Sequence, residues 1–140
     1  MQAIGVSNFN ASLLAALLPR MRHRPAVNQC GHSIGAHNDS QNAVNGGDDR
    51  TAGFCRANNI SYSAFSPLGG LSGIDVLNNP VVKGIASAHH VSAAQVALRW
   101  LVQQGITVVT AASNPEYISE DIHLFSFELT PAEMAALAAV

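Results

Sequence analysis

Three segments of this 140-residue chain end in the same way, with a strand-like run that gives way to small or polar residues. They are residues 3–9 (AIGVSNF), 27–29 (VNQ) and 60–70 (ISYSAFSPLGG). Helix-like segments separate them, and strands that alternate with helices predict a parallel sheet with right-handed crossovers. In such a sheet the carboxyl ends of the strands lie at one edge. The sequence therefore predicts a binding face where Ser7, Asn8, Gln29 and the loop 66–70 meet one ligand.

The chain as a whole predicts four strands, each followed by helix. The strands are expected at residues 3–7, 26–30, 60–65 and 107–111, and the helices at 11–18, 51–57, 81–89, 92–104, 115–124 and from 131 onward. Ser92 with Gln95 and Thr130 with Glu133 have the spacing of capping boxes. A closed barrel of eight β/α units usually needs about 250 residues. The chain therefore corresponds to about half of an α/β barrel, in one domain of residues 1–140.

Residues 33–50 stand apart in composition. They are rich in Gly, Asn, Asp and Ser and contain hardly any large apolar side chain. Such a stretch is typical of a surface segment with little to bury. The sequence predicts a flexible loop or insertion there, and we expect this segment to be the most open to proteolysis.

Composition and charge exclude several classes of partner. Hydrophobic residues make up 48% of the chain and charged residues 11%, which indicates a globular protein and not a disordered one. The formal charge is −2 and no basic stretch stands out, so neither nucleic acid nor a membrane surface is expected as a partner. No apolar run approaches the roughly 20 residues of a membrane span, and the first residues lack the order of a signal peptide. The expected location is cytoplasmic.

The motifs resemble the carboxyl-terminal half of the aldo-keto reductases. In family order they are AIGVSNF, PAVNQ with His32 shortly after it, AFSPLGG, AAQVALRWLVQQGITVV, and FSFELTPAEM after a helix that ends in Glu-Asp. Five motifs in order at compatible spacing make the resemblance specific, and it covers nearly the whole chain. It implies a parallel (β/α)8 TIM barrel of which this chain supplies strands five to eight. It also implies an oxidoreductase that uses NADP, sometimes NAD, to reduce a small carbonyl substrate.

The resemblance assigns cofactor contacts residue by residue. Ser7, Asn8 and Gln29 match the groups that bind the nicotinamide carboxamide, and Phe65 matches the aromatic residue that stacks on the nicotinamide ring. The loop residues that match the pyrophosphate contacts are Ser66, Leu68 and Gly69. Simpler interpretations stay open: Ser7 and Asn8 as caps of the next helix, Gln29 as a partner for polar groups inside the barrel, and Phe65 as core.

The last strand departs from the family pattern. NADPH-preferring members carry a Lys-Ser pair and an arginine that hold the 2′-phosphate, whereas the matching positions here are Ala111, Ala112 and Tyr117. Glu120 and Asp121 match an acid and an amide that face the adenine, with the amide replaced by an acid. Charge-assisted contacts to phosphate are the strong ones. We therefore expect weak NADPH selectivity or a preference for NADH.

The catalytic residues of the family lie outside the resemblance. The Asp, Tyr, Lys and His of its tetrad precede the first strand seen here, so this chain contains no matching catalytic residue and is expected to be inactive alone. It is then a truncated gene product, a partial gene model whose Met1 is not the true start, or a half-barrel that pairs with another polypeptide. The open strand edges of the isolated chain favour self-association. The alternative is a non-catalytic module that binds a nucleotide cofactor or regulates another protein. If the coding sequence upstream of this chain encoded the tetrad, the enzyme would be favoured over the non-catalytic module.

The sequence does not favour a metal site. Cys30, His32, His37 and Asp39 lie within ten residues and are possible zinc ligands, but they lack a CxxC-type spacing. His37 is expected to be solvated in a polar loop. Cys30 and Cys55 are expected to be reduced, buried thiols.

Overall fold

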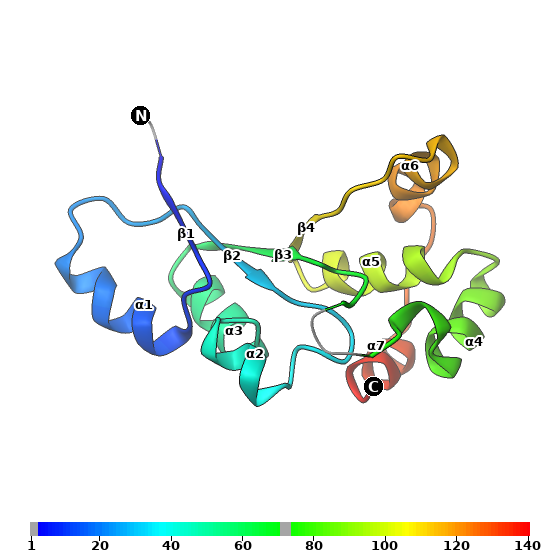
Figure 1. The fold of residues 1–140 in the computed structure, drawn as a ribbon, viewed down its shortest axis with the longest axis horizontal. Coiled ribbons are helices and arrows are strands. Elements are labelled where there is room, and N and C mark those ends of the chain that lie inside the picture. The colour runs from blue at the N-terminus through cyan, green and yellow to red at the C-terminus, as the bar shows by residue number, and fades with distance from the viewer. Residues whose placement is uncertain (1–2, 71–73) are drawn as a thin grey trace.

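The computed structural model describes residues 3–70 and 74–140. Its sheet has four parallel strands in the order β1 (Gly5–Ser7), β2 (Val27–Gly31), β3 (Ser61–Phe65) and β4 (Thr107–Val109), as Figure 1 shows. The register places four residues opposite one another in one row across the sheet: Ser7, Gln29, Ser63 and Thr107. The predicted parallel α/β arrangement is confirmed, although β4 ends two residues before the expected position.

Seven helices connect and flank the strands within the described residues. They are α1 (Ala11–Leu17), α2 (Ser40–Val44), α3 (Asp49–Ala57), α4 (Pro80–His89), α5 (Ala93–Gln103), α6 (Pro115–Ile122) and α7 (Pro131–Ala138). Short 3₁₀ turns follow at Leu18–Arg20, Val76–Asn78 and His123–Phe125. Both predicted capping boxes form, at Ser92 and at Thr130. Over the described ranges, no helix combines the length and the apolar character needed to cross a bilayer.

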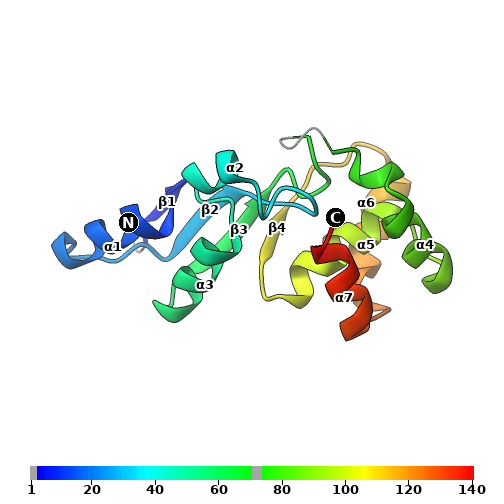
Figure 2. The same ribbon diagram turned by 90° about the horizontal axis from the view of Figure 1, so that it is seen from below.

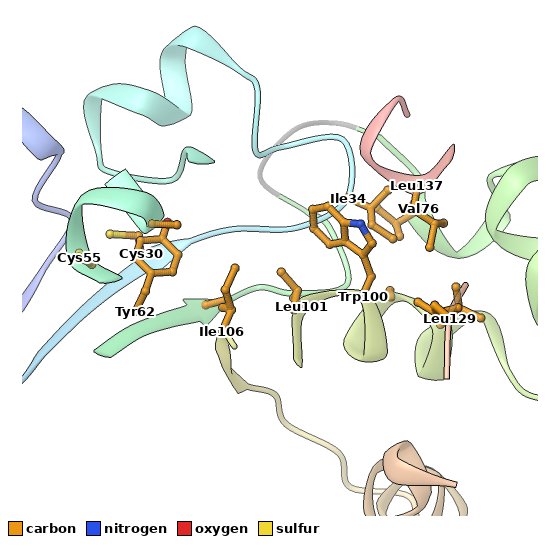
Figure 3. Close-up of a cluster of buried hydrophobic side chains, with 14 of the residues drawn as sticks. Cys30, Ile34, Cys55, Tyr62, Val76, Trp100, Leu101, Ile106, Leu129 and Leu137 are labelled. Carbon is orange, nitrogen blue, oxygen red and sulfur yellow. The ribbon is translucent and has the colours of Figure 1, made fainter. Parts of the chain in front are cut away.

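The sheet has one covered face and one open face. Helices α1, α3 and α5 lie on one side of the strands (Figures 1 and 2), and Cys30, Tyr62 and Ala64 are buried on that side. Figure 3 shows Tyr62 beside the two cysteines and, further along the same core, Trp100 near Ile34. On the opposite face the side chains of alternate residues point away from these helices, and the strand residues Ser7, Ser61 and Thr107 are exposed.

The segment 33–50 differs from the surface loop that its composition predicts. It contains α2 and the start of α3, and Ile34 is fully buried in the core. The Asn42 side-chain amide donates hydrogen bonds to three backbone carbonyls, those of Gly31, Ala36 and Gly47. A Cβ on Gly47 would lie 2.1 Å from the Gly31 carbonyl oxygen, so the segment folds tightly against the end of β2. Backbone hydrogen bonding to Asn42 thus orders residues that composition alone classes as loop. The flexibility of the segment stays a prediction.

Candidate functional site

The carboxyl ends of the first two strands place three predicted site residues together. Ser7 Oγ donates a hydrogen bond to the Gln29 carbonyl at 3.0 Å, and the Asn8 backbone N–H donates to the same oxygen at 2.9 Å. Asn8 has a left-handed backbone with φ of 60°, which turns the chain away from the sheet. Within the described residues the side-chain amides of Asn8 and Gln29 have no hydrogen-bond partner. Asn8 is exposed and Gln29 is half-buried, so solvent can reach both side chains.

The helix that follows is capped by another residue. Asn10 is the N-cap of α1, and its side chain accepts a hydrogen bond from the Leu13 N–H at 2.9 Å. The interpretation of Ser7 and Asn8 as caps of this helix is therefore wrong. Asn28, which the sequence did not single out, holds the intervening turn: its amide donates to the Phe9 carbonyl at 2.7 Å from a fully buried position. Strand alternation could have given this signal, because the fully buried Asn28 and the half-buried Gln29 point to opposite faces of the sheet.

β3 ends at Phe65, whose ring is half-buried, and a tight turn follows it. Phe65 lies in register with Gly31 and Val109, so its neighbour on β2 has no side chain to cover the ring. Ser66 and Gly69 both have positive φ, 51° and 95°, and the Gly69 N–H donates to the Ser66 carbonyl. A Cβ on Gly69 would lie 3.1 Å from the Ile74 carbonyl oxygen. The turn therefore suits glycine at this position.

The remaining predicted residues line one cavity of about 320 Å³. Its walls come from the turn after β3, the start of α5, the segment after β4, and α6; the lining residues are Leu68, Leu77, Ser92, Ala93, Ala94, Thr110, Ala111, Ala112, Tyr117, Glu120 and Asp121. Six of these residues are predicted site residues; Leu77, Thr110 and the three residues at the start of α5 are not. Among the residues that the structure describes, no lysine or arginine lines this cavity. The structure thus brings together residues that lie more than 40 positions apart in the chain.

Two carboxyl groups, those of Glu120 and Asp121, line the cavity. Ser92 Oγ donates a hydrogen bond to Glu120 Oε2 at 2.6 Å, and the Gln95 side chain donates to the Glu120 carbonyl at 3.1 Å. Because Ser92 is the N-cap of α5, the Glu120 carboxylate lies at the positive end of this helix. Burial and the neighbouring Glu120 raise the pKa of Asp121. The most favourable anion position in the cavity is therefore already taken by a carboxylate of the protein.

The four side chains weighed as zinc ligands do not converge. His37 Nδ1 lies 2.9 Å from an oxygen of Asp49, and His32 Nε2 lies 3.6 Å from the other oxygen. Asp39 instead caps α2, and burial raises the pKa of the Cys30 thiol to about 11. Cys30 and Cys55 are free, buried thiols. Within residues 3–70 and 74–140 no group of three such side chains could hold a metal ion.

One expectation about this cluster is wrong. His37 is not solvated: it is 3% exposed, and its ring packs against Trp100 with ring centroids 4.9 Å apart. The Asp49 partner lies at the start of α3, which the sequence analysis began two residues later. An imidazole that has both an aromatic and a carboxylate partner can be buried at little cost, and neither partner is near it in sequence.

Comparison with known proteins identifies the family. The family model described as the Aldo/keto reductase family matches residues 1–140. The chain belongs to the aldo/keto reductase family. It is 38% identical over 138 residues to a 7-acetyl-epi-neemfruitin B aldo-keto reductase of Melia azedarach, matching 95% of this chain and 40% of that protein. It is also 38% identical over 132 residues to an NAD(P)H-dependent 6′-deoxychalcone synthase of Glycine max, covering 92% of this chain and 39% of the relative.

Solved structures of aldo/keto reductases agree with this assignment. The aldose reductase from Schistosoma japonicum superposes with a TM-score of 0.84 at 28% identity, over 99% of this chain and 41% of that one. An aldo-keto reductase from a Medee basin deep-sea metagenome library gives the same TM-score at 31% identity, over 99% and 48%. The chain thus has part of the family's TIM-barrel fold and spans about 40% of the length of the curated relatives described above.

Proposed function

We propose that this chain is the cofactor-binding half of an oxidoreductase that reduces small aldehydes or ketones with NADPH or NADH. The cavity carries the proposal, because it joins Leu68, Ala112 and Glu120, which come from three separate segments, next to the open ends of the strands. A reduced nicotinamide, when bound, supplies a hydride to the carbonyl carbon of the substrate. The residues of this chain would bind and orient the dinucleotide, and a general acid would have to come from elsewhere.

The nicotinamide end would lie on the open face of the sheet. The free amides of Asn8 and Gln29, with the Ser7 hydroxyl, offer donors and acceptors to a carboxamide, which itself has both. Holding that group fixes which face of the nicotinamide ring meets the substrate. The half-buried Phe65 ring, next to Gly31 in register, offers a flat apolar surface on which the nicotinamide ring could stack.

The phosphates and the adenosine would extend from this face into the cavity. Ser66, Leu68 and Gly69 form the turn between the two regions, and Leu68 lines the cavity itself. The adenosine would lie among Ala112, Glu120 and Asp121. An extended ligand fits this arrangement. Its polar ring would meet the unpartnered amides at the strand ends, and its larger group would occupy the cavity.

The cavity favours a free ribose over a phosphorylated one. A 2′-phosphate would enter a space that the described residues line with two carboxyl groups and with no lysine or arginine. It would also find the positive end of α5 already occupied by Glu120, which Ser92 holds at 2.6 Å. Like charges at short range are costly where water is partly excluded. A ribose hydroxyl, in contrast, can donate a hydrogen bond to a carboxylate. NADH should therefore bind at least as well as NADPH.

A binding titration tests the nicotinamide contacts. Loss of one amide partner should weaken NADH binding about 2- to 10-fold, the equivalent of one hydrogen bond. We would titrate NADH into the unmodified chain and the Gln29→Leu variant by isothermal calorimetry. Gln41→Leu, an exposed residue on α2, is the matched control and should bind as the unmodified chain does. If none of the three chains binds either cofactor, the proposed function fails.

A second titration tests the choice of cofactor. The double variant Ala111→Lys plus Tyr117→Arg supplies the missing cations and should tighten NADPH about 10-fold or more, with a much smaller effect on NADH. Val44→Lys adds a charge on α2, away from the cavity, as the control. Unmodified chain that binds NADPH a hundredfold tighter than NADH would show that other residues hold the phosphate.

A further inference from the structure

The charged residues of this chain are unevenly distributed. Residues 1–38 contain three arginines and no acidic residue, which gives them a formal charge of +3. Residues 39–140 contain four of the seven basic residues and all nine acidic ones, a formal charge of −5. The three arginines of the first part are Arg20, Arg22 and Arg24, and His23 lies among them. The total charge of −2 conceals this stretch, which is more basic than we expected from the chain as a whole.

Residues 20–24, called the basic loop below, lie between α1 and β2. Because they precede β2, they are at the amino ends of the strands, the opposite end of the sheet from the candidate site (Figure 1). Arg20, Arg22, His23 and Arg24 are all exposed. The ion pairs among the described residues all have histidine as the cation. Within this part of the chain, therefore, no carboxylate pairs with the three guanidinium groups.

The backbone of the basic loop is held at both ends. Leu18, just before it, is buried at 6% exposure, and Pro25, just after it, is buried as well. The Met21 N–H donates a hydrogen bond to the Leu18 carbonyl at 3.3 Å, and the Ala26 N–H donates to the Ile4 carbonyl at 2.8 Å. A partner would thus meet arginines on a backbone that is already ordered, which lowers the entropy cost of binding.

The chemistry and the length of the basic loop fit a short acidic segment. A guanidinium group binds a carboxylate through two parallel hydrogen bonds, with both charge and geometry in its favour. The four steps from Arg20 to Arg24 span at most about 14 Å. An extended peptide of about five residues has the same length, so consecutive acidic side chains of a partner can reach all three arginines.

Two other polyanions fit less well. Peptides that bind a lipid surface combine cations with exposed large apolar side chains, and the only large apolar residue of the basic loop, Met21, is half-buried. A long nucleic acid would extend beyond the loop along α1. The seven residues of α1 rise about 10 Å, and at the far end Asp48 lines a cavity with Asn10 and Ser12. Repulsion at about one Debye length then opposes a longer polyanion.

From these observations we infer that the basic loop docks an acidic segment of a partner protein. The docking surface lies at the amino ends of the strands, whereas the candidate cofactor site lies at their carboxyl ends. A bound partner would leave that site open. The inference does not depend on cofactor binding.

Fluorescence anisotropy with a labelled hexaglutamate peptide tests the docking. The full chain should bind hexaglutamate and not labelled hexaglutamine, and a rise from about 50 to about 300 mM NaCl should weaken binding at least about 3-fold. Arg22→Glu plus Arg24→Glu should weaken it at least about 10-fold, because each change replaces attraction by repulsion. Arg22→Gln plus Arg24→Gln removes the charges without reversing them and should give a smaller loss in the same direction.

The matched control makes the same change in net charge elsewhere. Arg50→Glu plus Lys83→Glu lies on α3 and α4, at exposed positions, and should alter binding by less than about 2-fold. Circular dichroism checks that each variant is folded. Equal binding of the two peptides, or equal losses in the basic-loop and control variants, overturns the inference. Tighter binding of a DNA duplex or of phosphatidylserine vesicles than of hexaglutamate would also overturn it, because the loop would then serve a nucleic acid or a membrane.

Discussion

The two faces of the four-stranded sheet differ most clearly in two adjacent amides of β2. Asn28 is fully buried on the covered face and bonds to both backbone groups of Phe9. Gln29 points to the open face, where its amide has no partner within the described residues. A buried polar group that lost its partners would be costly, whereas the half-buried Gln29 amide can keep water as a partner. The covered face therefore stabilises the fold, and the open face can change without unfolding the chain.

The prediction with the largest expected effect concerns catalysis. It tests whether the open face alone can support the reduction of a carbonyl group. The purified 140-residue chain should show no measurable NADH- or NADPH-dependent reduction of a nitrobenzaldehyde, followed by absorbance of the reduced cofactor. We expect this chain to lack a general acid, and such a loss alone accounts for about 10²–10⁴-fold in rate. A full-length aldo/keto reductase serves as the positive control. Robust turnover by this chain would mean that the open face carries a proton donor not recognised in its sequence.

The next effect concerns pH and the covered face. Burial lowers the pKa of His32 to about 4 from its ordinary value of 6.5, because the protonated ring would lose water. The unfolded chain therefore takes up a proton first as the pH falls, and stability is lost between pH 6.5 and about 4. The loss should reach about 3 kcal/mol. Asp49, whose pKa is lowered chiefly by its hydrogen bond to His37, loses its contribution only below this window.

Urea denaturation at a series of pH values measures this effect. His32→Asn should flatten the profile between pH 6.5 and 4, whereas His23→Asn, at an exposed position, should leave its slope unchanged. Tyr62 supports the neutral ring: its hydroxyl donates to the Gly46 carbonyl at 2.6 Å and so accepts from His32 Nδ1 at 3.2 Å. An unchanged slope in His32→Asn would assign the pH dependence to other groups.

A smaller effect compares the two amides directly. Asn28→Leu should lower the free energy of unfolding by about 1–3 kcal/mol, because it removes the partners of the Phe9 backbone. Gln29→Leu should change it by less than about 0.5 kcal/mol. Thermal denaturation of both variants gives the comparison. Equal losses would show that the open face is as important for stability as the covered one.

The smallest expected effect is the order of proteolytic cleavage. Cuts should begin in residues 38–45, where Asn38, Gln41 and Val44 are exposed, and come before any cut in α5. Asn42→Ala should speed these cuts, because three carbonyls lose their donor. Mass spectrometry of a limited digest identifies the sites. First cleavage inside α5 would contradict its place in the core.

Local signals predicted most of the secondary structure and the family. Caps and proline positions placed α4, α5 and α7 because the groups that start a helix lie within four residues of one another. The boundaries were less accurate where the partner is distant: β4 ends at Val109 and α6 at Ile122. The largest difference is in residues 33–50, which contain α2 and the start of α3, and where the Asn42 side chain donates hydrogen bonds to three backbone carbonyls that composition does not record.

The sequence by itself determined the parallel α/β class, the four β/α units and the candidate residues at the strand ends, since each depends on short-range patterns. Only the tertiary structure decided that Ser92 holds Glu120 at the start of α5, that His32 and His37 share Asp49, and that six predicted residues line one cavity. His37 and Asp49 are 12 residues apart along the chain, and Ser92 and Glu120 are 28 residues apart. The cavity joins residues that are further apart still. Their geometry is set by how helices pack on the sheet, and a linear pattern of residue types does not contain it.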